Sequence, residues 1–349
     1  MSILRSVRWG MIGCGDVAEV KSGPGFQKSN GSALVAVMRR DRERAEDFAT
    51  RHDIPRVHSQ AEELIDDPEV DAVYVATPPS SHCELALKVA GAGKPCLVEK
   101  PMAMNHTECV RMVEAFRRAG APLWVAYYRR ALPRFLKVRA LLESGVIGRL
   151  TSVHIRVHAP LSTGEKAHAW RFDPAIAGGG LFLDLGSHCF DLLDFLVGPI
   201  SAIEGFAVNS GHTYAAEDVT GAVFRFAGDI VGTGIWNFNA PDTVDQIVFT
   251  GSDGELKTPV FRNSDISVVH VGKEGEAQAR QRAAVRDVYR MRNPLHVHQP
   301  LIQTIVDELL GSGKCPSTGE TGARTSWVMD RCLTNYYVTI PPQPRLSAP

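Results

Sequence analysis

The first third of the chain alternates short apolar runs with polar stretches of helical period. The apolar runs are rich in Val, Ile, Leu and Ala and lack a polar face, which is typical of strands buried on both sides of a parallel sheet. The pattern therefore predicts an α/β domain of the doubly wound type. The expected strands are Val7–Ile12, Leu34–Met38, Ala72–Ala76, Cys96–Val98 and Trp124–Tyr127, and the expected helices are Arg42–Arg51, Cys83–Gly91 and Thr107–Ala119.

After Tyr128 the apolar positions alternate with polar ones, as in VHIRVH and AVFRF. Alternation with period two is typical of antiparallel strands with one covered face. We therefore expect an α+β domain on a largely antiparallel open sheet, with two late helices covering one face. A partner subunit would cover the other face, so we expect a homo-oligomer, a dimer or tetramer. The expected strands are Thr151–Val157, Ala202–Asn209, Val219–Phe226, Ile230–Phe238 and Gln246–Thr250, and the expected helices are Pro133–Glu143, Pro300–Leu310 and Gly322–Tyr336.

The length of 349 residues favours two domains, because single cores rarely grow so large. We place a dinucleotide-binding domain at 1–128 and a domain for substrate binding and oligomerisation at 129–340. A proline-rich tail at 341–349 is expected to fray.

Composition narrows the class of partner. With 44% hydrophobic and 22% charged residues and a net charge of −1, the chain reads as globular, with no electrostatic reason to bind nucleic acid or a membrane surface. A small molecule is the expected partner. Seven scattered cysteines without a CxxC pair, and no signal or membrane-spanning run, indicate a cytoplasmic protein with reduced thiols.

A glycine motif follows the first expected strand and opens a helix. Gly13, Cys14, Gly15, Asp16, Val17 and Ala18 form GxGxxA, in which the glycines permit a tight turn and the approach of a pyrophosphate to the helix N-terminus. The run Ser22-Gly23-Pro24-Gly25 is expected to end this helix early and to leave Lys21 and Ser22 on a loop.

The end of the second strand bears on the choice between NAD and NADP. The strand ends in Met38, Arg39 and Arg40 where an NAD-binding carboxylate would stand, and guanidinium groups suit a 2′-phosphate. This favours NADP. A displaced acid, Asp41, or a merely solvated basic corner is the alternative.

Two further segments carry ionisable groups. Glu99, Lys100 and Pro101 follow the fifth strand, so the lysine lies at the carboxyl edge of the sheet, although such a lysine is often only solvated. After a triple glycine, Asp184, His188 and Asp191 stand at i, i+4 and i+7 of an apolar helix and would share one face. The alternatives are a buried structural histidine with carboxylate partners, or a metal site, for which a third ligand is not evident and which we do not expect. His296 and His298, a tempting metal pair, stand before a helix start and are interpreted as surface or helix-entry residues.

The sequence resembles the Gfo/Idh/MocA family of oxidoreductases. The matching pieces are GCGDVA, ATPPSSH (Ala76–His82), EKP (Glu99–Pro101), YYRR (Tyr127–Arg130), WRFDP (Trp170–Pro174) and GGGLFLDLGSHCFDLL, in the expected order over most of the chain. The resemblance implies a Rossmann domain, an α/β domain with an open sheet commonly used for oligomerisation, and NAD(P)-linked chemistry on sugars, polyols or related alcohols.

By the same resemblance, Lys100, Asp184 and His188 would form the catalytic group. A histidine can act as base in alcohol oxidation, and a lysine can stabilise the charge that develops on the reacting oxygen. Asp184 would orient His188 or hold a substrate hydroxyl. Thr77, Pro78, His82 and Glu99 would lie near the cofactor, and Tyr128, Arg129, Trp170 and Arg171 would line the pocket.

Two other functions stay open from the sequence. One is an enzyme that keeps a tightly held dinucleotide and performs net redox-neutral chemistry. The other is a dinucleotide-binding sensor without catalytic activity.

Overall fold

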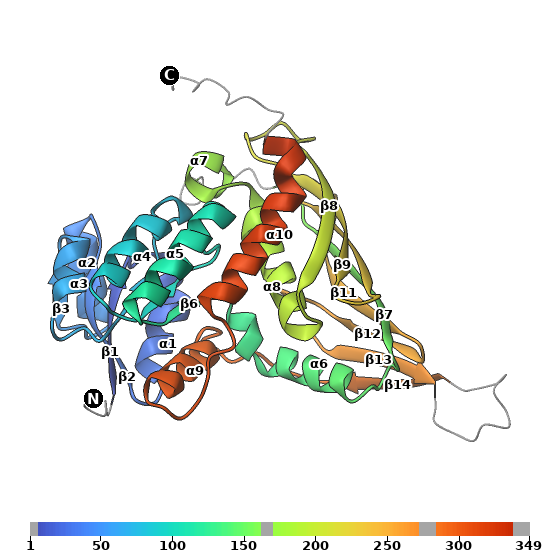
Figure 1. The fold of residues 1–349 in the computed structure, drawn as a ribbon, viewed down its shortest axis with the longest axis horizontal. Coiled ribbons are helices and arrows are strands. Elements are labelled where there is room, and N and C mark those ends of the chain that lie inside the picture. Colours follow the sequence, from blue (N-terminus) through green and yellow to red (C-terminus); the bar gives the residue numbers. More distant parts are fainter. Residues whose placement is uncertain (1–5, 162–169, 272–283, 338–349) are drawn as a thin grey trace.

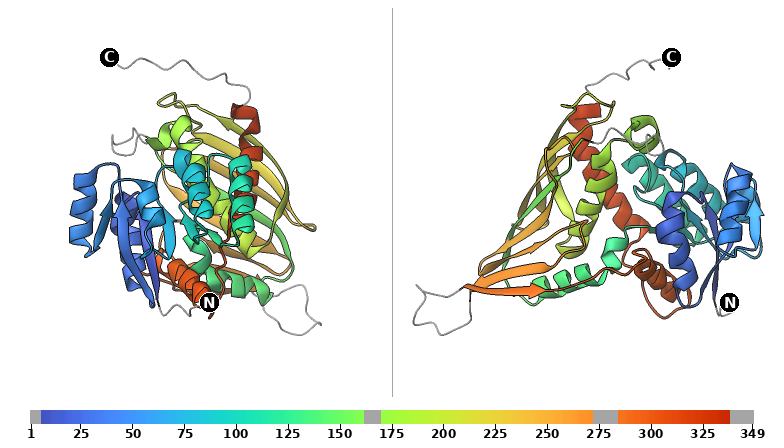
Figure 2. Two further views of the ribbon diagram at one scale, coloured as in Figure 1. Left: turned by 60° about the vertical axis from the view of Figure 1, so that its left-hand side comes forward. Right: turned by 180° about the vertical axis from the view of Figure 1, so that it is seen from behind.

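The computed structural model describes residues 6–161, 170–271 and 284–337. The predicted tail at 341–349 lies outside the described residues. Two β-sheets dominate the fold, one in each part of the chain, and helix α10 runs between them (Figures 1 and 2).

The first sheet confirms the predicted doubly wound architecture. Six parallel strands lie in the order β3-β2-β1-β4-β5-β6. The strand order reverses between β1 and β4, and ligands of such sheets bind at the carboxyl ends on either side of that point. The elements are β1 (Val7–Ile12), η1 (Ala18–Ser22), α1 (Gly23–Lys28), β2 (Ser32–Met38), α2 (Arg42–Arg51), β3 (Arg56–His58), α3 (Ala61–Asp66), β4 (Ala72–Val75), η2 (Pro79–Ser81), α4 (His82–Gly91), β5 (Cys96–Val98), α5 (His106–Ala119) and β6 (Leu123–Val125).

The second sheet is the expected largely antiparallel one, with more strands than the pattern predicted. Among the described residues eight strands lie in the order β14-β13-β12-β11-β7-β10-β9-β8, and only the β7–β10 pair is parallel. The elements are η3 (Tyr128–Ala131), α6 (Pro133–Glu143), β7 (Leu150–His158), α7 (Pro174–Ala177), η5 (Phe182–Gly186), α8 (Ser187–Leu196), β8 (Ile200–Val208), β9 (Val219–Phe226), β10 (Val231–Asn237), β11 (Val244–Gly251), β12 (Gly254–Thr258), β13 (Ile266–Val271), β14 (Ala284–Tyr289), α9 (Gln299–Leu309) and α10 (Gly319–Tyr337).

One expectation about the late helices is wrong. Helix α10 packs on β8 of the second sheet, but it also contacts α5 and β6 of the first part. Helix α9 packs on α1 and on η3, not on the second sheet. Its apolar residues Leu301, Ile302 and Ile305 are buried in that contact region. The amphipathic spacing predicted that α9 buries one face, but it could not predict which elements that face packs against.

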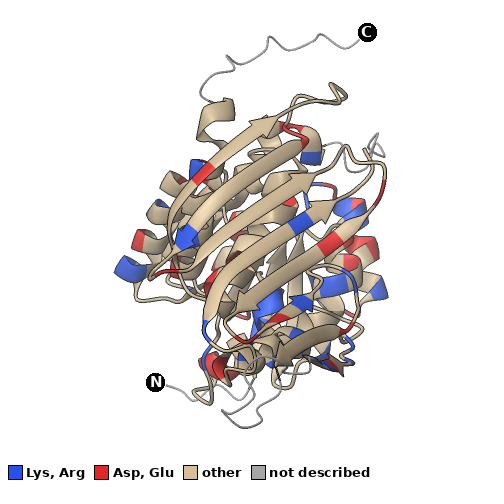
Figure 3. Cartoon of the chain, turned by 90° about the vertical axis from the view of Figure 1, so that its right-hand side faces the viewer, with Lys and Arg blue, Asp and Glu red and all other residues tan. Residues whose placement is uncertain are grey.

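The outer face of the second sheet lacks a helical cover (Figure 3). It is mostly uncharged, and several large apolar side chains on β8, β9 and β10 are exposed there. They are Phe206, Val208, Val223, Val231 and Ile235. No helix within the described ranges is long and apolar enough to span a bilayer.

The contact between β8 and α10 generates a stability prediction. A Cβ on Gly205 of β8 would lie 2.5 Å from Cys332 Sγ and 2.7 Å from the Cys332 carbonyl oxygen, whereas a Cβ on Gly221 of β9 would meet nothing closer than 4.0 Å. We therefore expect Gly205→Ala to lower the free energy of unfolding by about 1–3 kcal/mol through overpacking. Gly221→Ala, the matched control, should change it by less than about 0.5 kcal/mol. Thermal unfolding followed by circular dichroism measures both, and equal melting of the two variants would contradict the packing described.

Candidate functional site

The glycine turn has the geometry that a bound pyrophosphate requires. Gly13 has φ +97°, and a Cβ there would lie 2.9 Å from the Ala76 backbone and from Thr77 Cγ2. A Cβ on Gly15 would meet no atom within 4 Å. Gly13 thus needs its glycine for the turn itself, whereas Gly15 leaves open space in which a ligand can approach the backbone at the helix N-terminus. Cys14 is buried beside the turn, and Asp16 and Val17 begin the helix.

The first helix corrects the predicted break. Residues 16–28 are helical throughout, with a π turn, η1, leading directly into α1. Pro24 directly follows the π turn, in which the Gly23 N–H bonds to the Ala18 carbonyl five residues back, so the proline is accommodated without ending the helix. Lys21 and Ser22 therefore belong to the helix, and Ser22 is buried.

Two arginines, Arg39 and Arg40, follow β2, and the carboxylate next to them, that of Asp41, is already bound within the protein. Arg39 Nη1 donates to the Cys14 carbonyl at 2.9 Å, so its guanidinium lies beside the glycine turn. Arg40 is exposed and Met38 is buried. Asp41 caps α2 by accepting from the Arg44 N–H at 3.2 Å, and its carboxylate also pairs with the Arg44 guanidinium.

The loop after β4 is tied to the loop after β5 through His82. The His82 side chain is fully buried, and its ring nitrogens face the Thr77 carbonyl at 2.6 Å and the Pro101 carbonyl at 3.0 Å. Burial lowers its pKa in spite of these contacts. His82 therefore joins two loops, while Thr77 and Pro78 stay at the sheet edge beside Gly13. The bond between Lys100 and Pro101 is cis.

Lys100 and Asp184 form an ion pair between the two parts of the chain. Lys100 Nζ donates to Asp184 Oδ1 and, at 3.3 Å, to the Asp184 carbonyl. Arg171 Nε lies 3.8 Å from the other carboxylate oxygen, and its guanidinium stacks on Trp170 at 4.8 Å. Burial would raise the pKa of Asp184, but Lys100 and Arg171 outweigh it and hold that pKa below its ordinary value. The aspartate is thus ionised and holds the lysine, and neither of its oxygens bonds to His188.

A second π turn changes the predicted spacing on α8. Phe182–Gly186 form a π turn, so Asp184 and Asp191 do not share the face that an uninterrupted α-helix would give them. Asp191 instead forms a buried ion pair with Arg130 at 2.8 Å, next to Asp194 and Arg324. The prediction that Asp191 shares the ionisable face is therefore wrong, because the extra residue in the turn rotates α8.

His188 is a buried imidazole surrounded by rings and cations. It is 3% exposed, and its ring lies edge-on to Tyr127, Tyr128 and Phe261. Its Nδ1 has no hydrogen-bond partner among the described residues. Burial, and then the charges of Arg129, Lys100 and Lys21, lower its pKa well below the ordinary value. His188 is consequently neutral at physiological pH and able to accept a proton.

Sequence reasoning missed a series of buried polar side chains, in contact with one another, next to this histidine. Glu99 is buried, accepts from the Tyr74 hydroxyl and from the Lys100 N–H, and lies 3.6 Å from His298 Nδ1. The His298 ring stacks on Tyr128 at 4.6 Å, while His296 contacts Lys28. Burial raises the pKa of Glu99 and, with neighbouring cations, lowers that of His298 to about 3. His298 does stand at a helix start, but it is buried rather than on the surface, and only its tertiary contacts reveal this.

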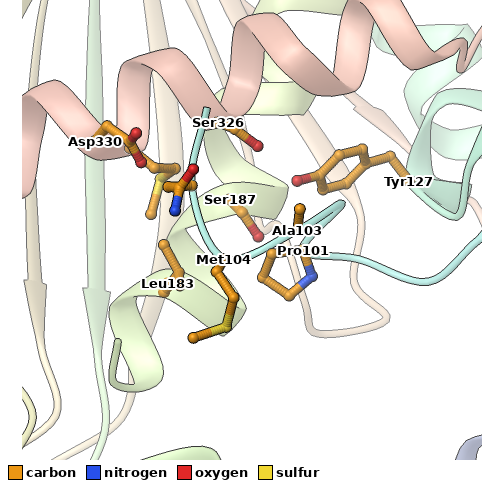
Figure 4. Close-up of a pocket in the computed structure, with 10 residues that line it drawn as sticks. Pro101, Ala103, Met104, Tyr127, Leu183, Ser187, Ser326 and Asp330 are labelled. Carbon is orange, nitrogen blue, oxygen red and sulfur yellow. The ribbon is translucent and has the colours of Figure 1, made fainter. Parts of the chain in front are cut away.

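A small cavity lies behind the site (Figure 4). It is bounded by the loop after β5, by η5 and α8, and by α10. Its lining residues are Pro101, Ala103, Met104, Asn105, Tyr127, Leu183, Ser187, Ser326, Met329 and Asp330. Because Lys100, Asp184 and His188 are not among them, this cavity is separate from the candidate site. Within the described ranges, no three His, Cys, Asp or Glu side chains are grouped as metal ligands would be.

Two family models match the chain in sequence order. Residues 7–127 match the oxidoreductase family with an NAD-binding Rossmann fold, and residues 135–257 match the Gfo/Idh/MocA C-terminal domain. The first match covers the whole parallel sheet, and the second covers strands β7 to β11 and most of β12 of the second sheet.

Curated relatives match over most of their length. Oxidoreductase P35 of Formosa agariphila is 38% identical over 93% of this chain and 97% of its own. A 1,5-anhydro-D-fructose reductase of Ensifer adhaerens is 28% identical over 90% of this chain and 92% of its own. A trans-1,2-dihydrobenzene-1,2-diol dehydrogenase of Bos taurus is 29% identical over 77% and 79%, respectively.

A solved structure shares the fold. Levoglucosan dehydrogenase in complex with NADH and levoglucosan superposes with a TM-score of 0.81, covers 95% of this chain and 98% of its own, and is 22% identical. Together with the glycine turn and the Lys100–Asp184 pair, these matches confirm the resemblance read from the sequence: the chain belongs to the Gfo/Idh/MocA family of NAD-binding Rossmann-fold oxidoreductases.

Proposed function

We propose that this protein is an NAD(P)-dependent dehydrogenase or reductase that acts on a hydroxyl or carbonyl carbon of a sugar, polyol or related compound. The observation that carries the proposal is the Lys100–Asp184 ion pair beside a neutral His188, at the same sheet edge as the open glycine turn. The names of the relatives, which include an anhydrofructose reductase and a diol dehydrogenase, support the substrate class.

Each residue has a part that its contacts support. A bound nicotinamide supplies the acceptor or donor of hydride. Lys100 Nζ donates two hydrogen bonds to Asp184. Its third N–H can donate to the reacting oxygen and stabilise the negative charge there. His188 accepts the hydroxyl proton in oxidation and returns it in reduction. Asp184 holds Lys100 in position.

We further propose that NADP is the preferred dinucleotide. Arg39 lies beside the glycine turn, Arg40 is exposed at the strand tip, and the nearest acid, Asp41, caps α2. A guanidinium pair without a competing carboxylate favours a 2′-phosphate.

The open face of the second sheet supports a homo-oligomer. Its exposed apolar row is flanked by Glu204 and Arg225, so a two-fold related copy could bury the row and pair the acid with the base. All seven cysteines are free and buried, which supports a reducing, cytoplasmic setting.

Substitution of the two glycines of the turn should have different effects, one on dinucleotide binding and the other on stability. Gly15→Ala places a methyl group in open space, so it should leave the melting temperature unchanged and raise the dissociation constant for the dinucleotide roughly tenfold or more. Gly13→Ala strains a positive φ and meets the Ala76 backbone, so it should lower the melting temperature. Fluorescence titration with NADPH and a thermal melt measure both. Unchanged binding in Gly15→Ala would place the dinucleotide elsewhere.

If Arg40 binds the 2′-phosphate, its removal should weaken the binding of NADPH but not that of NADH. Arg40→Ala should weaken NADPH binding roughly tenfold and leave NADH binding nearly unchanged, because only NADPH carries the 2′-phosphate. Arg42→Ala, at an exposed position paired with Glu46, is the control. A parallel loss for both dinucleotides would rule out discrimination by Arg40.

The proposed role of His188 as the base predicts a lower kcat when it is replaced and a particular pH dependence of the wild-type rate. His188→Asn should lower kcat for alcohol oxidation by about 10²–10⁴ while cofactor affinity changes little. Since the pKa of His188 lies below its ordinary value and the neutral form is the base, wild-type oxidation should keep its rate down to acidic pH and fall only below the usual imidazole range. The acidic limb should vanish in His188→Asn. His154→Asn, exposed on β7, should behave as wild type.

Phe206→Glu tests the assembly. A carboxylate in the exposed apolar row, on the edge strand β8, should dissociate the oligomer without unfolding the chain, because Phe206 is 75% exposed. Light scattering after gel filtration measures the mass. A wild-type monomer at micromolar concentration would refute the oligomer.

A further inference from the structure

Arg129 is a buried cation with most of its hydrogen-bonding capacity unused. It is 5% exposed, and Nε donates to the Val260 carbonyl at 3.1 Å. Among the described residues neither terminal nitrogen donates a hydrogen bond, and Nη1 is fully buried without a partner. An unpaired buried guanidinium is costly, so its presence calls for a partner that the chain does not supply.

The neighbours of Arg129 do not neutralise it. Arg134, fully buried on α6, donates to the same Val260 carbonyl at 3.2 Å, so two guanidinium groups share one oxygen. Neither forms an ion pair with a described residue. The Asp245 carboxylate is occupied by the backbone N–H groups of Val260, Phe261 and Arg262. Burial and the charge of Arg129 lower the pKa of Arg134 to about 10.

The free end of Arg129 belongs to the candidate site. Its guanidinium lies 4.7 Å from the ring centroids of both Tyr128 and Phe261. His188 lies edge-on to the same two rings, and the charge of Arg129 acts on both His188 and His298. A group bound by Arg129 would therefore sit next to the hydroxyl that His188 deprotonates.

The site as a whole carries excess positive charge. Lys21, Lys100, Arg129 and Arg171 act on Asp184 or His188, and the acids near them are Asp184, Glu99 and Asp191, of which Asp191 is paired with Arg130. Asp184 is already paired with Lys100 and Arg171. The phosphates of a bound dinucleotide lie at the glycine turn and not at Arg129, so a neutral polyol would leave Arg129 unpaired, whereas the carboxylate of an anionic substrate would pair with it.

We propose that the preferred substrate is a sugar acid or polyol acid, whose carboxylate accepts a hydrogen bond from Arg129 Nη2 beside the reacting carbon. The inference rests on the dehydrogenase activity proposed above and names its substrate class. Nε is fixed by the Val260 carbonyl and Nη1 is buried, so Nη2 is the donor that remains for a ligand. A charge-assisted hydrogen bond from a guanidinium favours a carboxylate over a neutral hydroxyl.

The test compares substrates that differ in one group. We would measure kcat/KM for D-glucitol and D-gluconate, D-glucose and D-glucuronate, and D-galactose and D-galacturonate, with D-glucose 6-phosphate as a differently shaped anion. We expect the carboxylates to exceed their neutral partners roughly tenfold or more. Arg129→Gln removes a charge that also acts on His188, so it should lower the values for both classes, and those for acids roughly 10- to 100-fold more than those for neutral substrates. Arg129→Lys, which keeps the charge, should fall between wild type and Arg129→Gln for the acids, and exposed Arg139→Gln should match wild type.

Each outcome decides the inference separately from the dehydrogenase activity. Equal or better turnover of neutral substrates by wild type, preference for the phosphate, or equal losses for both classes in Arg129→Gln would overturn it while leaving the dehydrogenase proposal intact. Should no compound be turned over, the dehydrogenase proposal fails. Calorimetric titration of the NADPH-loaded wild type with D-gluconate and D-glucitol then still decides the carboxylate site, since tighter gluconate binding supports it and equal or absent binding refutes it. Because this titration needs only the wild-type protein, it also decides the carboxylate site if an Arg129 variant does not fold.

Discussion

The ion pair between Lys100 and Asp184 is the contact on which the candidate site depends. Lys100 follows β5 at the carboxyl edge of the parallel sheet, and Asp184 lies in the π turn that begins α8. The pair therefore joins the dinucleotide-binding sheet to the helix that carries His188. The nearby cations also keep Asp184 ionised despite its burial.

The cations around the pair set the chemistry of His188. A buried imidazole next to Arg129, Lys100 and Lys21 is neutral, as a proton acceptor must be. In the proposed oxidation the same cations would stabilise an alkoxide on the reacting oxygen. The aromatic rings of Tyr127, Tyr128 and Phe261 hold the imidazole among these cations.

Much of the fold could be predicted from periodicity, since β1, α2, α6 and β9 have the bounds that the pattern indicated. The three-residue strand β3 could not, because so short a run has no measurable period. Both π turns were also invisible. One kept the first helix continuous through Pro24, and the other directed Asp191 to Arg130 instead of the site.

The site was predictable where a motif marks it and not where tertiary contacts create it. Gly13, Gly15, Lys100 and His188 stand in motifs whose spacing indicates a role. Nothing in the local sequence shows that His298 is buried against Tyr128, or that Phe261 and Val260 enclose Arg129. These neighbours lie more than a hundred residues away along the chain, and only the folded structure brings them together.

The most direct test of the central claim is the transfer of deuterium from substrate to cofactor. The wild-type protein would be incubated with NADP or NAD and with sugars, polyols and their acids deuterated at the hydroxyl-bearing carbons, and the reduced nicotinamide would be analysed by mass spectrometry. We expect one deuterium in each reduced nicotinamide formed, matched by one new carbonyl in the product. Reduced cofactor without deuterium, or no reduction by any compound in a protein that binds the dinucleotide, would contradict hydride transfer at this site.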